Sequence, residues 1–525
     1  MTKTERRIWF GIGLLALGAL LIRFVHLGDK PLHHDESLHA FYGLELFRGN
    51  GYEYNPVTHG PLLFALVAFT DWLVGVSDAG VRVGTALFGW VLVMMPFILR
   101  KDWGMRVSVI AMVLLALSPN MLYVSRFLRH DPLMHVWTFA LVIALYRYIR
   151  THRPPTLLWI GILSAFAFST SETSYITFFM LATFLFGGAL FETVFKRDSR
   201  LLRDAVRSLG KNWKALLGMC AIFAGISVVF YSTFFTNWEG AKTALPNPFD
   251  PNSGLGYWIA QHDVHRGGQP WYYYFLSLGL YEFVPLIAGV VGSVYLLLKK
   301  PTLLGSMLLW WLILFLVIYS WAGEKFPWLV TYPLIPLILV ASYALKDVRI
   351  RIQTRAIAPL AVVVVMFSFW VYSAFRLSFQ NPADPREFAV YVQTTKDAVR
   401  VATLIRSDAL LRGTDVVDAH VEGELTWPFA WYLRDVPIRS YDKELSAAPT
   451  AKYVLVSQSQ EPQWQPYLEG YNKIGERYQL RAWWVPPIAR EQRYTIRELT
   501  DYFLDRTIWG NPEGSVLFSV YERRQ

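Results

Sequence analysis

The chain has 525 residues, of which 54% are hydrophobic and 16% aromatic, and its formal net charge is +10. This length indicates two or more domains, and the apolar and aromatic content is typical of a protein that crosses a membrane several times. The positive charge does not indicate nucleic-acid binding, because cytoplasmic loops of membrane proteins are rich in Lys and Arg. The single cysteine, Cys220, excludes an intramolecular disulfide and leaves the redox compartment open.

Eleven apolar runs are long enough, or nearly long enough, to cross a bilayer as helices, which takes about 20 residues each. They cover residues 9–27, 80–99, 106–125, 132–149, 156–170, 173–191, 214–234, 271–298, 303–321, 327–345 and 355–376. The first run follows Lys3, Arg6 and Arg7, as in a signal peptide, but no small-residue cleavage site comes after it. We therefore expect a mainly α-helical, polytopic membrane domain of about eleven spans, with its first span retained.

Basic residues are concentrated in five of the segments between these runs. The five segments are 100–106, 147–153, 196–214, 299–300 and 346–355. All of them lie on one side of the membrane if the N-terminus is inside, which agrees with the positive-inside rule for cytoplasmic loops. This orientation predicts an outer location for residues 28–79, 126–131, 171–172, 235–270, 322–326 and everything after 377.

The apolar segment 61–76 is the main ambiguity in this topology. It is short and contains Asp71, and counting it as a span would invert every later loop. We therefore interpret it as a helix in the outer membrane interface. The segment 36–48 has an apolar face beside charged residues and is interpreted in the same way.

The composition changes after Asn381, where charges become frequent and apolar runs become short. Strand patterns occur at 388–393, 415–420, 452–457 and 515–521, and helix patterns at 395–411, 423–434 and 495–508. Alternating strands and helices favour an α/β domain with partly parallel strands. We expect a transmembrane domain at 1–378 and a soluble, extracytoplasmic α/β domain at 379–525.

Polar residues are rare within the spans and cluster at their predicted outer ends. The first cluster, His33-His34-Asp35-Glu36, precedes an expected helix. Asp35 is suited to be the N-cap of that helix, but a cap does not require neighbouring histidines. We therefore prefer a hypothesis in which one carboxylate accepts a proton or binds a metal while the other orients it.

A second cluster lies before the fourth span and contains Arg126, Arg129, His130, Asp131 and Pro132. Asp followed by Pro is an ordinary helix start, so a capping role for Asp131 is the simpler alternative. The two arginines are less expected on the outer side, and an anionic phosphate is a suitable partner for them.

Two further segments carry candidates for the same site. Glu172 lies in a Ser/Thr-rich segment that is also consistent with a solvated turn. Glu324 and Lys325 follow the ninth span, where they form either a local ion pair of little energy or, for Lys325, a phosphate ligand.

The loop at 235–270 contains His262, Asp263 and His265, whose side chains are of the types that bind metals. No single segment has tight metal-ligand spacing, so a divalent ion would need ligands from several parts of the chain. The other candidate ligands are His33, His34, Asp35 and His59.

Seven short motifs occur in order along the chain: HHDESLHA (33–40), HGPLLF (59–64), RFLRHDPLM (126–134), TSETSYI (170–176), RGGQPWYYY (266–274), GEKFPWLVTYPLIP (323–336) and WPFAWYLRD (427–435). Their order and spacing resemble the GT-C fold glycosyltransferases, which include protein O-mannosyltransferases, lipid A aminoarabinose transferases and oligosaccharyltransferases. Within that superfamily the chain is most similar to the prokaryotic flippase-activity-associated membrane proteins, a branch that implies no defined reaction.

The resemblance implies a polyprenyl-phosphate sugar donor and an inverting transfer at the outer face of a prokaryotic plasma membrane. It implies that Asp35 is the general base, that Glu36 orients it or helps to hold a metal, and that Asp131 is the second acidic residue. The other residues assigned to the site are Arg129, Lys325 and Arg266 for the donor phosphate, His59, Glu172, Glu324 and Arg126 as substrate-binding or supporting residues, and His34, His262 and His265 for a possible metal ion. His34 beside Asp35 departs from the general pattern of the superfamily.

Two other functions fit the composition. A transport role for lipid-linked saccharides would use charged groups within the spans, of which Glu282 is the main example. A non-catalytic scaffold would bind a partner through the α/β domain, for which the aromatic segment 427–432 is a candidate face. The gathering of Asp35, Asp131 and Lys325 at outer span ends favours the transferase.

Overall fold

The computed structural model describes residues 3–195, 200–264, 268–299, 302–345, 357–484, 495–509 and 514–524. Internal contacts divide the chain into two units. The first, called the helical unit, consists of Met1–Val25, Arg48–Leu66 and Arg82–Gln380. The second, called the mixed unit, consists of His26–Phe47, Val67–Val81 and Asn381–Gln525. Two early segments thus group with the C-terminal residues, which the sequence did not predict.

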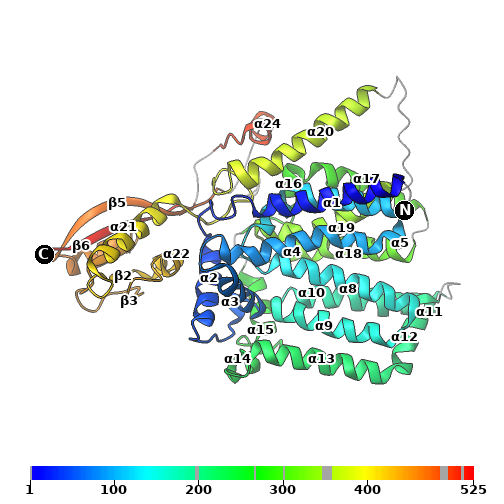
Figure 1. Cartoon of the computed structure of the whole chain (residues 1–525), viewed down its shortest axis with the longest axis horizontal. Helices are drawn as coiled ribbons and strands as arrows, with labels where there is room; N and C mark the ends of the chain where they lie inside the picture. The colour runs from blue at the N-terminus through cyan, green and yellow to red at the C-terminus, as the bar shows by residue number, and fades with distance from the viewer. Residues whose placement is uncertain are drawn as a thin grey trace. The chain divides into compact units, whose positions relative to one another are not determined.

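The helical unit is a bundle in which neighbouring helices such as α8, α9 and α13 pack side by side (Figure 1). Its helices are α1 (Lys3–Phe24), α4 (Val83–Met94), α5 (Arg100–Trp103), α6 (Met105–Leu117), α7 (Pro119–Ser125), α8 (Asp131–Thr151), α9 (Pro154–Thr170), α10 (Ser174–Ala182), α11 (Gly188–Val194), α12 (Leu201–Lys211), α13 (Trp213–Tyr231), α14 (Trp238–Thr243), α15 (Gly254–Val264), α16 (Tyr273–Tyr281), α17 (Phe283–Leu298), α18 (Leu303–Trp321), α19 (Thr331–Ala344) and α20 (Ile357–Phe375). Helix α3 (Leu62–Val74) begins in this unit and ends in the mixed unit.

Within the described ranges, eight helices are long and apolar enough to cross a membrane, and two bent helix pairs would bring the number to ten. The predicted spans at 106–125 and 271–298 correspond to the bent pairs, and the one at 156–170 to α9, which has only 17 residues. The remaining predicted spans each correspond to one long helix. The prediction of a polytopic helical membrane protein with a small C-terminal sheet domain is therefore confirmed.

Helix α3, which covers the ambiguous segment, has 13 residues. At about 1.5 Å per residue it extends roughly 20 Å, whereas the hydrocarbon core of a bilayer is about 30 Å thick. The helix is therefore too short to be a complete span. The second predicted interfacial helix corresponds to α2 (His34–Phe47).

Small residues let the helices of the bundle approach closely, as is common between membrane helices. A Cβ atom on Gly161 of α9 would lie 2.6 Å from the backbone oxygen of Met219 on α13. A Cβ atom on Gly289 of α17 would lie 2.3 Å from the side chain of Leu337 on α19. Larger side chains at these glycines would therefore push the paired helices apart.

The two bent helix pairs meet at the fully buried Glu282, which lies at the 112° bend between α16 and α17. Its Oε1 atom accepts hydrogen bonds from the Ser118 hydroxyl at 2.7 Å and from the Asn120 backbone N–H at 2.8 Å. Those donors lie at the 65° bend between α6 and α7. The Asn120 amide and the Trp370 indole donate to the same carboxylate. One side chain thus joins two broken helices.

The mixed unit contains α2 and a six-stranded sheet in the order β1-β5-β6-β4-β2-β3. Its strands are β1 (Gln393–Thr394), β2 (Ala419–Val421), β3 (Ile438–Ser440), β4 (Tyr453–Ser457), β5 (Tyr471–Ala482) and β6 (Val516–Arg523), and its helices include α21 (Lys396–Arg412), α22 (Thr426–Tyr432), α23 (Glu461–Trp464) and α24 (Ile496–Asp505). Strand β2 pairs in parallel with β3 and β4, whereas β1, β5 and β6 form antiparallel pairs. The expected partly parallel sheet is present, but the expected strand at 388–393 is wrong apart from Gln393, and β3 and β5 were not predicted.

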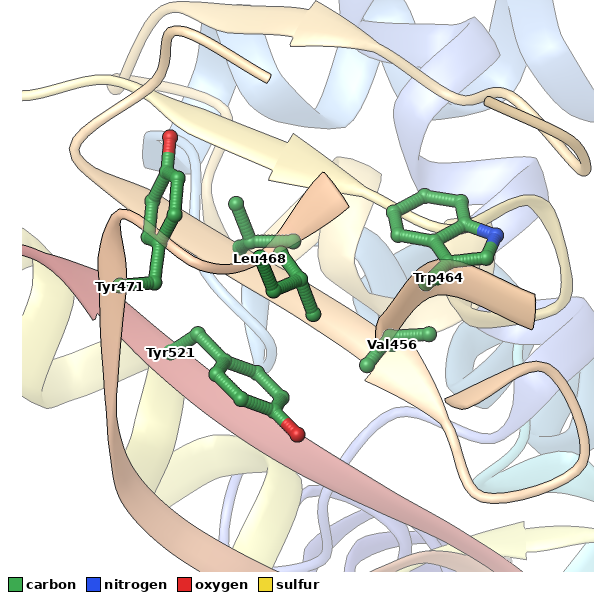
Figure 2. Packing of buried hydrophobic residues seen from close by; sticks show 6 residues of the cluster. Val456, Trp464, Leu468, Tyr471 and Tyr521 are labelled. Atoms are coloured by element: carbon green, nitrogen blue, oxygen red, sulfur yellow. The ribbon is translucent and has the colours of Figure 1, made fainter. Parts of the chain in front are cut away.

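One face of this sheet carries an apolar core, shown in Figure 2. Val456 of β4 and Tyr521 of β6 pack with Trp464, Leu468 and Tyr471, which follow β4 in sequence. The Tyr471 hydroxyl donates to the backbone oxygen of Ala451 at 2.6 Å, so the polar end of this ring is satisfied inside the core. The C-terminal residues therefore form a folded body with a hydrophobic core of its own.

Asp71, on the part of α3 that belongs to the mixed unit, is buried. Neither of its carboxylate oxygens has a hydrogen-bond partner within the described ranges. Burial raises the pKa of Asp71 to about 7, and the charge of Arg434 partly opposes this increase. Because the folded pKa exceeds the unfolded one, ionisation of Asp71 destabilises the fold as the pH rises from about 4 to above 7.

We expect Asp71→Asn to raise the unfolding temperature of the purified protein at pH 8, by about 2–5 °C, because it removes the buried charge. The gain should be clearly smaller at pH 5, where Asp71 is already protonated in the folded protein. Thermal unfolding in detergent at both pH values measures the difference. Asp501→Asn, on the exposed face of α24, is the matched control. An equal gain at both pH values would contradict the interpretation.

Candidate functional site

A cavity of about 480 Å³ lies within the helical unit. Its polar lining includes six of the predicted site residues. These six are His59, Arg129, Asp131, Glu172, His262 and Glu324. The other walls are mainly apolar and aromatic, and include Tyr319, Trp321 and Trp328. Segments far apart in the sequence thus bring charged groups to one largely apolar cavity.

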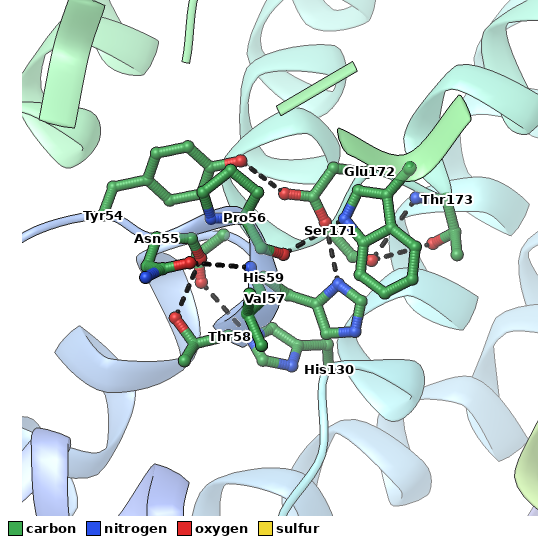
Figure 3. A network of polar contacts seen from close by, with 12 residues as sticks. Tyr54, Asn55, Pro56, Val57, Thr58, His59, His130, Ser171, Glu172 and Thr173 are labelled. Atoms are coloured by element: carbon green, nitrogen blue, oxygen red, sulfur yellow. Dashed lines mark hydrogen bonds and ion pairs between the residues drawn. The ribbon is translucent and has the colours of Figure 1, made fainter. Parts of the chain in front are cut away.

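His59 and Glu172 form the best-defined polar contact of this cavity, shown in Figure 3. The Nδ1 atom of His59 lies 2.8 Å from Oε2 of Glu172, and the Tyr54 hydroxyl donates to Oε1 at 2.6 Å. An ionised carboxylate only accepts hydrogen bonds, so Nδ1 carries the hydrogen. The Nε2 atom is then the ring nitrogen with which His59 can contact a ligand. Burial, followed by the charge of Glu172, raises the pKa of Tyr54, which keeps this phenol a donor.

Aromatic rings hold His59 on two sides. The Trp258 ring stacks on it with centroids 4.7 Å apart, and the His130 ring meets it edge-on at 5.1 Å. The Trp258 indole donates to the backbone oxygen of Pro56 at 3.1 Å, which fixes the stacking ring to the loop that carries His59. The orientation of His59 is therefore determined before any ligand binds.

Gly60 brings the loop of His59 against the segment that carries Glu172. A Cβ atom on Gly60 would lie 2.3 Å from the backbone oxygen of Ser169, closer than any side chain tolerates. The backbone oxygen of Gly60 also lies 3.2 Å from Nε2 of His130. A glycine at this position is thus a condition for the contact between His59 and Glu172.

Arg129 and Asp131 form a second group in the cavity. The Nε atom of Arg129 donates to Oδ2 of Asp131 at 3.1 Å, and the guanidinium lies over the Trp328 ring at 4.0 Å. Helix α8 begins at Asp131, and its cap residue is His130, which makes no side-chain capping bond. The alternative that Asp131 is an N-cap is therefore wrong, and its carboxylate faces the cavity group instead.

The other two described cationic candidates, Lys325 and Arg126, donate hydrogen bonds to backbone oxygens. Lys325 is buried, and its Nζ atom donates to the backbone oxygen of Ala322. It is not among the described residues that line the cavity, although the adjacent Glu324 is. Burial lowers the pKa of Lys325. Arg126 donates to the backbone oxygens of Ile22, Arg23 and Val25, so it satisfies carbonyl groups at the C-terminal end of α1.

His262 lines the cavity from α15, four residues after Trp258. Its Nδ1 atom accepts from the backbone N–H of Gly323 at 3.1 Å, and its ring stacks on Trp321 with centroids 4.2 Å apart. Within the described ranges, no three His, Cys, Asp or Glu side chains are grouped to hold a metal ion. His265 and Arg266 lie outside those ranges, so the metal site and the role of Arg266 stay predictions.

The acidic motif at 33–36 belongs to the mixed unit. Helix α2 begins at His34, so Asp35 lies within its first turn and is not the N-cap. His33 takes the capping position: its Nδ1 atom accepts from the backbone N–H of Asp35 at 3.0 Å. Glu36 accepts from the backbone N–H of His33 at 2.9 Å, which is one of the two hydrogen bonds of a capping box. Burial lowers the pKa of His33 to about 3, so the ring is neutral and able to accept.

The two carboxylates of this motif therefore differ in environment. Glu36 is fully buried and also lies 3.6 Å from the ammonium of Lys30. Asp35 is only partly buried. His34 accepts at Nδ1 from Arg481 at 2.8 Å, which occupies a lone pair that a metal ion would require. Of the two, Asp35 is the carboxylate whose exposure suits chemistry.

Sequence reasoning missed Tyr54, Trp258 and Trp328 as parts of the site. The spacing of Trp258 and His262 on one helix, i and i+4, places both on the same face and was an available signal. Trp328 lies in one of the seven motifs without an assigned role. Tyr54 carries no local pattern that distinguishes it from other tyrosines.

Residues 58–231 match the family described as dolichyl-phosphate-mannose-protein mannosyltransferase. This stretch contains His59, Arg129, Asp131 and Glu172 but not the acidic motif. A search of curated protein sequences gives no significant match.

Two solved structures of ArnT from Cupriavidus metallidurans resemble most of the chain. The apo structure aligns with a TM-score of 0.60 at 14% identity over 90% of this chain and 96% of the other. The structure bound to undecaprenyl phosphate aligns with a TM-score of 0.62 at 16% identity over 90% of this chain and 97% of the other. At these identities the likeness concerns the fold.

We expect Gly60→Ala to lower the thermal stability of the full-length protein, because the added methyl group meets the backbone at Ser169. Overpacking of this kind costs about 1–3 kcal/mol. Thermal unfolding in detergent measures the effect, and Gly18→Ala on α1, where a Cβ atom meets nothing within 4 Å, is the control. Equal unfolding temperatures for the two variants would show that the loop of His59 is not tightly packed.

Proposed function

Because the chain has the fold of the GT-C glycosyltransferases, we propose that it is a membrane enzyme that transfers a sugar from a polyprenyl-phosphate-linked donor to an acceptor hydroxyl, with inversion. We place this reaction at the outer face of a prokaryotic plasma membrane. The acceptor is a protein, lipid or glycan that the chain does not identify.

The observation that carries the proposal is the mixed character of the cavity. A polyprenyl-phosphate sugar has an apolar chain, an anionic phosphate and a polar sugar. The cavity offers aromatic walls, the guanidinium of Arg129 and several carboxylates and imidazoles within one space. The related fold of ArnT, solved with undecaprenyl phosphate, supports a ligand of this lipid class.

In the proposed reaction, the acceptor oxygen forms a bond to the anomeric carbon, and the bond from that carbon to the phosphate oxygen breaks. The acceptor proton passes to a carboxylate, and the lipid leaves as a phosphate monoester. We assign the carboxylate to Asp35, and Glu36 fixes the loop that carries it through the hydrogen bond to the backbone of His33. Arg129, a cation that lines the cavity, would stabilise the charge that develops on the leaving phosphate.

Asp131 and the His59–Glu172 pair have supporting roles in this scheme. Asp131 orients the guanidinium of Arg129, since the two side chains are bonded at 3.1 Å. Glu172 orients His59 so that Nε2 is the ring nitrogen offered to the sugar or the phosphate. Glu324, which follows α18, and His262 of α15 line the same cavity and would also contact the ligand.

A transport function has less support than the transferase. Its main sequence evidence was the buried charge at Glu282, which a coupled transporter would use as a relay. That carboxylate instead accepts hydrogen bonds from Ser118, Asn120 and Trp370. Its role in joining two helix bends accounts for its burial without a transported ion.

Turnover of a labelled polyprenyl-phosphate sugar by the purified full-length protein tests the proposal. We expect Asp35→Asn to reduce kcat by about 10²–10⁴-fold with little change in the KM of the donor, as for loss of a general base. Glu239→Gln, an exposed change on α14, should leave turnover unchanged. Full turnover in Asp35→Asn would exclude this residue as the base. No turnover of any donor, with lipid movement in liposomes, would favour transport.

We expect Arg129→Lys to raise the KM of the lipid donor by about tenfold, because a lysine loses the forked donors and the stacking on Trp328. The kcat should fall less than the affinity if the residue mainly binds the donor. Arg147→Lys, an exposed change on the same stretch of chain, is the control. An unchanged KM would exclude a role of Arg129 in donor binding.

A further inference from the structure

The loop that carries the acidic motif is held by residues of the C-terminal domain, all within the mixed unit. The Gln393 amide donates to the backbone oxygen of Pro31 at 2.9 Å, and the backbone N–H of Leu32 donates to the Tyr432 hydroxyl at 2.7 Å. The His33 ring is hydrogen-bonded to the backbone oxygen of Tyr391. Three successive residues of the loop thus have partners more than 350 positions later in the chain.

The next residue of the loop, His34, is bound by Arg481. The Nη1 atom of Arg481 donates to Nδ1 of His34 at 2.8 Å, and Nη2 lies 3.4 Å from Oε1 of Glu424. The guanidinium is therefore shared between the imidazole and a carboxylate of the same domain. It also lies within the electrostatic influence of Asp35.

The backbone of Arg481 is held by neighbouring strands on both sides. It lies near the end of β5, and its backbone is paired with Thr394 of β1 on one side and with Val516 of β6 on the other. Its side chain is mostly buried, at 14% relative exposure. A group that projects from an interior strand is placed more accurately than one on a loop.

The hydrogen bond from Arg481 also determines the tautomer of His34. A guanidinium only donates hydrogen bonds, so Nδ1 of His34 must accept and the ring hydrogen must be on Nε2. The His34 ring is thus held by the C-terminal domain one residue before Asp35.

We propose that Arg481 is a positioning residue for the acidic motif: it holds His34 and thereby sets the direction in which the Asp35 carboxylate points. The C-terminal domain then supports the loop that carries Asp35. The ion pair with Glu424 does not explain this arrangement, because a partly exposed pair is worth little. The expected loss of activity rests on the proposed function, whereas the support of the loop by Arg481 does not.

The kinetic test uses the full-length protein and a double-mutant cycle. We expect Arg481→Ala to reduce kcat by about 10²-fold, as a displacement of about 1 Å at a reacting group does, with the donor KM changed less than about twofold. His34→Ala should cause a similar loss, and the double variant should lose little more than either single one, because both act through the same ring. Arg497→Ala, whose side chain is exposed on α24, is the control.

The structural test does not depend on activity. Amide hydrogen exchange in residues 31–36 should become faster in Arg481→Ala, whereas exchange in the bundle helices should be unchanged. Arg481→Lys, which keeps the charge and one donor, should restore part of the protection. Arg497→Ala should exchange as the wild type does.

These measurements separate the two proposals. A wild type that transfers no sugar, combined with faster exchange of the loop in Arg481→Ala, would remove the proposed function and keep Arg481 as the support of the loop. A raised donor KM with unchanged kcat would instead make Arg481 a donor-binding residue and overturn the proposal. Unchanged exchange in the loop, or additive losses in the double-mutant cycle, would also overturn it.

Discussion

A helix that bends inside a bilayer exposes backbone N–H groups where no water can satisfy them. Glu282 meets this constraint at the bend between α6 and α7, where its carboxylate accepts from the backbone N–H of Asn120, and it does so from the break between α16 and α17. Helix α7 leads directly into the segment 126–131, which carries Arg129 and Asp131 to the cavity. The polar site of the helical unit therefore depends on a buried carboxylate that itself lines no part of it.

The site chemistry reflects a recurrent arrangement in which a charged group is held by a second group and an aromatic ring. Arg129 is bonded to Asp131 and lies over Trp328, and His59 is bonded to Glu172 and stacks on Trp258. The carboxylate in each case fixes direction, and the ring excludes water from one face, which strengthens the electrostatic interaction. Such pairs keep a cation or an imidazole oriented in an apolar cavity without an additional ligand.

The sequence predicted what depends on composition and missed what depends on tertiary contact. Long apolar runs determine spans, so the bundle was predictable, although a continuous run at 106–125 concealed the bend that Pro119 begins. The strand β5 was missed because polar residues lie on both of its faces, so its sequence lacks the alternation of apolar and polar residues that indicates a strand. The segment 388–393 was wrongly predicted as a strand because a short buried apolar run does not have to pair with another strand. The capping roles considered for Asp35 and Asp131 failed by two residues and by one residue, which is the usual uncertainty of a helix end. The contact of His59 with Glu172 joins residues 113 positions apart, for which no local pattern exists.

The contacts that hold residues 31–34 have a consequence for the synthesis of the protein. The partners of residues 31–34 follow them by 358 to 447 positions, so a ribosome must add nearly the whole chain before the loop is anchored. At about 5–20 residues per second, this delay is roughly 20–90 seconds. During that time residues 31–34 lack the partners that hold them. Under the proposed function, Asp35 gains a fixed direction only after the C-terminal domain has been made.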